Sequence, residues 1–253
     1  MQSIAAVVIL QLAFMSGSPA ASVGVVDAGD AFSDLDRVVE TIQALGHRAE
    51  ILPADDLLRP TGVGHYDCVI LAHRSGPLTE AGYRALDEYV REGGTLLLTG
   101  LAAYWMKPPE AGQARIRIAG AGPLAETAGT TVTGGPEKPI HRLLVTGNDP
   151  ATAGLPESFT LQTAPPYDIR QPASWRHAGV YVIQARSATP LIKVETVDAQ
   201  GGPVTADFLT VKISGRGWCY RLALCRLAPL VFEKKEQNIS LVLQNILKQS
   251  TIR

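Results

Sequence analysis

The sequence has few of the residues that would indicate a disulfide scaffold or a metal centre. Its three cysteines, Cys68, Cys219 and Cys225, are odd in number and irregularly spaced, which argues against a disulfide framework. The five histidines are scattered, and no CxxC, HxH or HExxH spacing occurs. The sequence therefore predicts no metal site and no cofactor.

An excess of charge of either sign is also lacking. The chain has 23 basic and 24 acidic residues, a formal net charge of -1, and no basic run. It thus lacks the electrostatic footprint of a protein that binds nucleic acid or an anionic membrane surface. Apolar residues, in contrast, are abundant. Of the 253 residues, 46% are hydrophobic, which is enough to form the core of one large domain.

The first residues form an uncharged apolar segment. The run Ile4 to Phe14 is followed by small residues, with Ser18 and Ala20 placed as at a signal-peptidase site. This pattern predicts a signal peptide over residues 1–21 and export to the periplasm or the cell exterior. The run is shorter than the about 20 residues that span a membrane, so no membrane span is expected after signal removal. The alternatives are a first buried strand at Ala5–Leu10 and a start codon placed too far upstream.

Residues 22–106 have the pattern of an α/β core. Two amphipathic helices are expected after Ser33 and Thr79, which are suited to the N-cap position, and they end at glycines. They alternate with short, almost continuously apolar strands, as in a sheet covered on both faces. The sequence predicts a doubly wound, mostly parallel sheet in a three-layer flavodoxin-like sandwich. The predicted strands are 22–26, 48–52, 66–73 and 95–99.

Residues 107–253 have a different pattern, in which short strands alternate with turns rich in glycine and proline. We interpret this half as a β-rich elaboration of the same domain, which spans 22–253. A final amphipathic helix at 235–249 is expected to pack back on the first sheet. The predicted strands are 115–118, 130–133, 142–146, 180–184, 190–197, 207–213 and 218–224.

Three stretches resemble one known family. YDCVILAHRSGPLTEAGYRALDEYVREGGTLLLTG is similar to the core of class I glutamine amidotransferase-like domains. Trehalose-utilisation-protein-like domains and the trimerisation domain of certain β-galactosidases are closest in style. NDPATAGLPESFTL resembles their "HP...GLP..F" segment, with Asn148-Asp149-Pro150 where they have a histidine, and SGRGWCYRLAL resembles a later strand. The resemblance implies a flavodoxin-like fold.

The same resemblance implies a catalytic cysteine at the turn after the fourth strand, with a His and a Glu downstream. Such a nucleophile needs a strained turn, a nearby base and backbone N–H groups for the oxyanion. Here the nucleophile position falls on Leu101 or Ala102, and no H-x-E pair occurs near the C-terminus. Cys68 lies within a strand and is interpreted as a core residue. We therefore expect no glutaminase activity of the familiar kind.

Polar residues at the predicted carboxyl ends of the strands are the candidate ligand-binding groups, because ligands of doubly wound sheets bind there. Asp27 and Asp30 follow the first strand and either contact a ligand or cap the loop by accepting backbone N–H groups. His73 and Arg74 end the third strand. In one interpretation His73 acts as a base and Arg74 binds a carboxylate or phosphate of the ligand. In the other, His73 makes one structural hydrogen bond.

The fourth strand leads to Thr99, Tyr104 and Trp105. Aromatic rings beside a cleft stack on sugar faces, although these two are equally suited to packing under the following segment. The predicted function is thus an exported, non-catalytic module that binds a small polar or carbohydrate ligand, or assembles as a homo-oligomer or with a partner protein. The alternative is a divergent carbohydrate-processing hydrolase that uses Asp27, His73 and Thr99.

Overall fold

A computed structural model describes residues 19–29, 35–59, 62–72, 76–110, 112–118, 122–132, 140–162, 180–197, 202–224 and 236–252. The first half forms a parallel sheet in which β1 (Ser22–Asp27) lies between β2 (Arg48–Pro53) and β3 (Cys68–Leu71), and β3 pairs with β4 (Thr95–Thr99). The predicted parallel core is confirmed. β1, β3 and β4 are buried almost throughout, which explains their continuous apolar sequences, whereas the edge strand β2 is mostly exposed.

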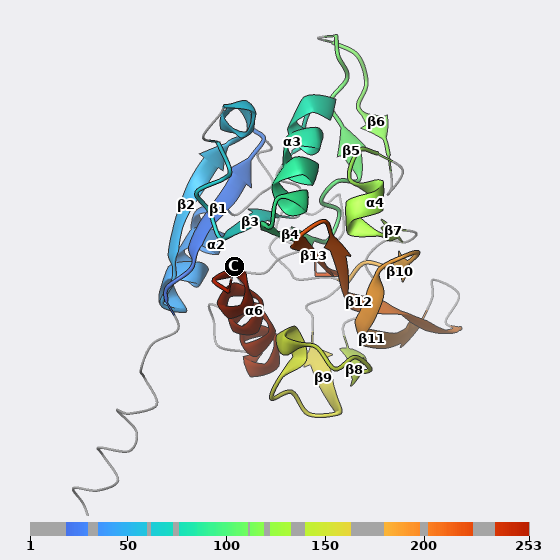
Figure 1. The fold of residues 1–253 in the computed structure, drawn as a ribbon. Coiled ribbons are helices and arrows are strands. Elements are labelled where there is room, and N and C mark those ends of the chain that lie inside the picture. Colours follow the sequence, from blue (N-terminus) through green and yellow to red (C-terminus); the bar gives the residue numbers. More distant parts are fainter. Residues whose placement is uncertain are drawn as a thin grey trace, which may run out of the picture.

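The β-rich half continues this sheet instead of forming a separate layer. β13 (Gly217–Leu222) pairs in parallel with β4, and antiparallel strands extend the sheet beyond it in the order β2-β1-β3-β4-β13-β12-β11-β8-β9. The result is the mixed α/β sheet of Figure 1. The added strands are β12 (Pro203–Ser214), β11 (Thr189–Val197), β8 (Ile140–Val145) and β9 (Ser158–Gln162), with β10 (Ile183–Ala185) and β7 (Thr130–Val132) beside β12.

Helices cover both faces of the sheet. α2 (Leu35–Ala44) and α6 (Gln237–Ser250) bury their apolar sides in one core cluster, so the closing helix packs on the first sheet as predicted. α3 (Glu80–Arg91) and the short α4 (Ala125–Ala128) pack in a second cluster on the opposite face. Short 3-10 helices η1 (Ala54–Leu58) and η2 (Pro150–Thr152) complete the described elements, together with a separate ribbon of β5 (Trp105–Met106) and β6 (Ile116–Arg117).

Local chemistry explains where α3 begins and ends. The Thr79 side chain accepts a hydrogen bond from the Gly82 N–H at 3.1 Å, which satisfies a backbone donor of the first turn, as the sequence predicted. Gly93 ends the helix with a φ of 115°, a conformation that favours glycine. The helix N-terminus is thereby fixed at the carboxyl end of the sheet, where the candidate site lies.

Candidate functional site

The turn after β4 holds no nucleophile. This turn, residues 100–103, has positive φ values of 48° at Gly100 and 55° at Ala103. Ala102 is 4% exposed and packs in the second core cluster, while Leu101 is half-buried against the first. A strained turn is therefore present, as in enzymes that raise a nucleophile on such a turn. It presents aliphatic side chains that point into the cores.

A buried arginine forms a hydrogen bond to the backbone of this turn. Arg221 lies on β13, is 3% exposed, and donates from Nη2 to the Gly100 carbonyl at 2.8 Å. The Gly100 N–H in turn donates to the Leu222 carbonyl at 2.9 Å. Burial lowers the pKa of Arg221 to about 10, although nearby Cys219 and Tyr83 oppose the shift, so the guanidinium is charged at neutral pH. This residue was missed in the sequence, where the only signal is one Arg inside an apolar strand.

A hollow of about 360 Å³ opens at the carboxyl ends of β1 and β2. Its size falls within the about 300–1,000 Å³ of small-molecule sites. Loops after both strands, the N-terminus of α3 and the residue after β5 form its walls. It is lined by Asp27, Ala28, Gly29, Pro53, Ala54, Asp55, Leu58, Pro77, Leu78, Thr79, Gly82 and Lys107.

The hollow, as these residues define it, combines two carboxylates, one ammonium and an apolar wall. Asp27 is half-buried, and its Oδ1 accepts the Gly29 N–H at 2.8 Å, which fixes the side chain at the rim of the hollow. Asp55 and Lys107 are exposed, and the Lys107 N–H is held by the Leu78 carbonyl at 2.8 Å. Such a surface offers acceptors, donors and apolar contact to one small polar molecule.

Next to the hollow, the β5–β6 ribbon presents an aromatic cluster with a cation. Trp105 and Arg117 lie directly opposite each other in the ribbon. The Trp105 ring meets the Tyr104 ring edge to face at a centroid distance of 5.2 Å, and the Arg117 guanidinium lies 5.0 Å from the Tyr104 centroid. Trp105 is 37% exposed. Because Lys107 follows Trp105 by two residues, roughly 7 Å of extended chain, the ribbon adjoins the hollow.

The structure brings some of the predicted residues together and separates others. Asp27 lines the hollow, with Tyr104 and Trp105 on the adjoining ribbon. Thr99 is 1% exposed, at the end of β4, and is not among the lining residues. Asp30, His73 and Arg74 lie outside the described residues, so their roles stay predictions.

The segment Asn148-Asp149-Pro150, which resembles the family's "HP" motif, connects neighbouring elements through hydrogen bonds. Asp149 Oδ1 accepts the Ala151 N–H at 2.8 Å in a capping box at η2. The hydroxyl of the fully buried Tyr220 contacts the same Asp149 oxygen at 3.3 Å and Gln249 Oε1 of α6 at 2.6 Å. Asn245 of α6 donates to the Ala153 carbonyl at 2.9 Å. These bonds join η2, β13 and α6.

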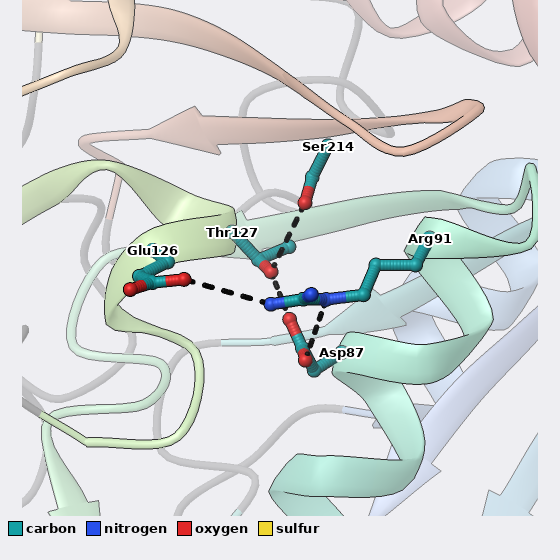
Figure 2. A network of polar contacts seen from close by, with 5 residues as sticks. All are labelled: Asp87, Arg91, Glu126, Thr127 and Ser214. Atoms are coloured by element: carbon teal, nitrogen blue, oxygen red, sulfur yellow. Dashed lines mark hydrogen bonds and ion pairs between the residues drawn. The ribbon is translucent and has the colours of Figure 1, made fainter.

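A second polar network ties α3 to the β-rich half (Figure 2). Arg91 contacts Asp87 at 2.9 Å and Glu126 at 3.6 Å. The fully buried Thr127 hydroxyl donates to the other Asp87 oxygen and lies 3.5 Å from the Ser214 hydroxyl. Because these side chains pair with one another, we interpret the network as structural.

Within the described part of the chain, no group of three or more His, Cys, Asp or Glu residues is placed to hold a metal ion. Cys68 and Cys219 are buried in the two cores, as expected for core residues, and burial raises the pKa of the Cys219 thiol to about 12. Cys225 lies outside the described residues. Among the helices of the described ranges, none is long and apolar enough to cross a membrane.

The strand order and the covering helices define the class of the fold, a flavodoxin-like α/β domain with a mixed sheet, and the turn after β4 holds no nucleophile. No protein-family model and no curated protein sequence matches the chain. Solved structures do match. A ThuA-like protein from Bacteroides uniformis aligns over 87% of both chains, with 16% identity and a TM-score of 0.56.

Two further structures show the range of proteins with this fold. A cytoplasmic protein from Salmonella typhimurium LT2 aligns over 90% of this chain and 98% of its own, with 13% identity and a TM-score of 0.58. The β-galactosidase from Rahnella sp. R3 aligns over 87% of this chain, with 16% identity and a TM-score of 0.53. This chain spans 31% of that enzyme's length. At these identities the likeness establishes the fold.

Proposed function

We propose that the protein is a non-catalytic module that binds a small polyhydroxylated ligand, such as a sugar, in the hollow beside Asp27. The observation that carries the proposal is the turn after β4, where the nucleophile position falls on Leu101 or Ala102, both aliphatic. An amidotransferase-like reaction needs a thiolate at this point and a base within hydrogen-bond reach. The arginine below the turn supports the same conclusion, since Arg221 bonds to the Gly100 carbonyl and fixes the turn in place.

The chemistry of the hollow supports a hydroxylated ligand. Carboxylates only accept hydrogen bonds and an ammonium only donates them, whereas a hydroxyl does both. A sugar therefore satisfies Asp27, Asp55 and Lys107 together, and its CH face fits the apolar wall at Leu58 and Leu78. An anion is disfavoured because the lining carries two carboxylates and one ammonium. The β-galactosidases with this fold are a further reason to choose sugars as probes.

The binding test uses calorimetric titration of the full chain with galactose, glucose, acetate and ethylamine. We expect the sugars to bind with millimolar affinity, and Asp27→Asn to weaken that binding about tenfold, as for one hydrogen bond to a charged group. Asp36→Asn, an exposed carboxylate on α2, is the control and leaves the affinity unchanged. If no sugar binds, or if acetate or ethylamine binds in place of sugars, the ligand assignment is wrong.

The catalytic test is an activity screen with glutamine and a panel of nitrophenyl glycosides. We expect no turnover. Robust turnover abolished by His73→Ala would favour the divergent hydrolase, for which Asp27 in the hollow is the one supporting placement.

Export belongs to the same proposal and rests on the apolar run Ile4–Phe14. Fractionation of producing cells with N-terminal sequencing tests it. A mature chain that starts near residue 21 or 22 is expected, and a cytoplasmic chain that retains residues 1–20 contradicts it.

A further inference from the structure

The β5–β6 ribbon has the properties of a second ligand subsite. Its exposed face carries Trp105 with Arg117 directly across from it, and cross-strand neighbours of this kind lie about 5 Å apart at Cβ. Tyr104 completes the cluster, because its ring contacts the Trp105 ring edge to face and also lies beneath the Arg117 guanidinium. Flat apolar rings beside a cation fit a ligand that has a flat apolar face and a negative charge.

The platform, as we call Tyr104, Trp105 and Arg117, is held rigidly although it lies on a two-residue strand. The Tyr83 hydroxyl, on a side chain 1% exposed, donates to the Trp105 carbonyl at 2.7 Å. The Ile118 N–H donates to the Tyr104 carbonyl at 3.0 Å. A backbone fixed in this way loses little entropy when a ligand binds, which favours a binding surface over a passive loop.

The platform continues from the hollow. Lys107 belongs to the hollow's lining and lies two residues beyond Trp105, and Met106 between them packs in the second core cluster. Trp105 and Lys107 therefore lie roughly 7 Å apart along the chain, at the border between the ribbon and the hollow. This spacing is comparable to the length of one sugar unit.

We propose that the hollow and the platform together bind an acidic oligosaccharide, with a neutral unit in the hollow and a uronate unit stacked on Trp105 with its carboxylate paired to Arg117. This inference rests on the proposed sugar-binding function and adds the ligand's length and charge. It follows from the difference in charge along the surface: in the hollow two carboxylates, Asp27 and Asp55, outnumber the one ammonium of Lys107, while the ribbon carries the guanidinium of Arg117. A neutral sugar in the hollow tolerates the carboxylates, and only the second unit meets Arg117.

The test compares digalacturonate, which carries a carboxylate on each unit, with a singly acidic disaccharide of glucuronate linked to galactose and with the neutral disaccharide lactose. Binding is followed by tryptophan fluorescence and calorimetry. We expect the singly acidic disaccharide to bind about tenfold more tightly than lactose at low salt, and this advantage to fall as salt screens the pair. Digalacturonate binds more weakly than the singly acidic compound, because its second carboxylate enters the acidic hollow.

Two variants and a control assign the effect to the platform. Arg117→Gln removes the advantage of the acidic disaccharide and leaves galactose binding unchanged, while Trp105→Leu weakens both disaccharides. Arg37→Gln on α2, which makes the same charge change at an exposed position away from the ribbon, has no effect. Circular dichroism and the melting temperature verify that each variant is folded.

The outcomes separate this inference from the proposed function. If galactose binds in an Asp27-dependent way but the disaccharides are insensitive to Arg117→Gln, the second subsite is wrong and the hollow stands. If galactose does not bind but the acidic disaccharide does and depends on Arg117, the platform stands alone. Equal binding of acidic and neutral disaccharides to the wild-type chain overturns the inference.

Discussion

Asp149 decides whether the Asn148-Asp149-Pro150 segment stabilises the fold or serves a ligand. Replacement of Asp149 by alanine removes the oxygen that caps η2 through the Ala151 N–H at 2.8 Å, a loss of about 1 kcal/mol. The same oxygen contacts the Tyr220 hydroxyl, but at 3.3 Å, which adds about 0.5 kcal/mol. We therefore expect Asp149→Ala to reduce the free energy of unfolding by about 1.5 kcal/mol.

The assay is thermal and urea unfolding of Asp149→Ala and Asp149→Asn beside the wild-type chain. For a domain of this size, about 1.5 kcal/mol corresponds to a decrease in melting temperature of roughly 3–6 °C. Asparagine keeps the oxygen acceptor and is an equally good cap, so Asp149→Asn should stay within about 0.5 kcal/mol of the wild type. Equal damage from both variants would refute the reasoning, because it would show that the negative charge, and not the cap, matters.

Three further changes test the packing and the pH dependence. Burial raises the pKa of the Tyr83 hydroxyl to about 12 from an ordinary 10, so the protonated hydroxyl stabilises the fold by about 3 kcal/mol below pH 10, and this contribution is lost between pH 10 and 12. Tyr83→Phe should therefore flatten this part of the curve of unfolding free energy against pH. An unchanged slope would contradict the assignment. Burial lowers the pKa of His47, whose neutral Nδ1 accepts the Ala21 N–H at 3.0 Å, so the free energy of unfolding should fall as pH decreases through about 6.5, the value in the unfolded chain. His47→Gln should reduce that fall. Equal acid sensitivity of the variant and the wild-type chain would contradict this prediction. Gly94→Ala should cost about 2 kcal/mol in urea unfolding, since the new Cβ would lie 2.2 Å from the ring of the buried Tyr89, and a neutral result would show that this ring can move.

The candidate site could be predicted from the sequence only where strand ends carry polar residues. Asp27 was found in this way, because parallel strands place their carboxyl ends at one edge of the sheet. Asp55 and Lys107 were not, since each lies in a segment whose local pattern indicates a turn. They join Asp27 only through the packing of η1 and β5 around the N-terminus of α3.

What the sequence determined by itself is local: the alternation of apolar strands and amphipathic helices, the Thr79 cap, the aliphatic turn after β4, and the helix that closes the first sheet. These features depend on neighbouring residues, whose periodicity is visible in the chain. The tertiary structure decided that β13 enters the sheet beside β4, which brings Arg221 to Gly100 across 121 positions of sequence. Strand order is set by which apolar faces pack best over the whole core, and no local pattern records that choice.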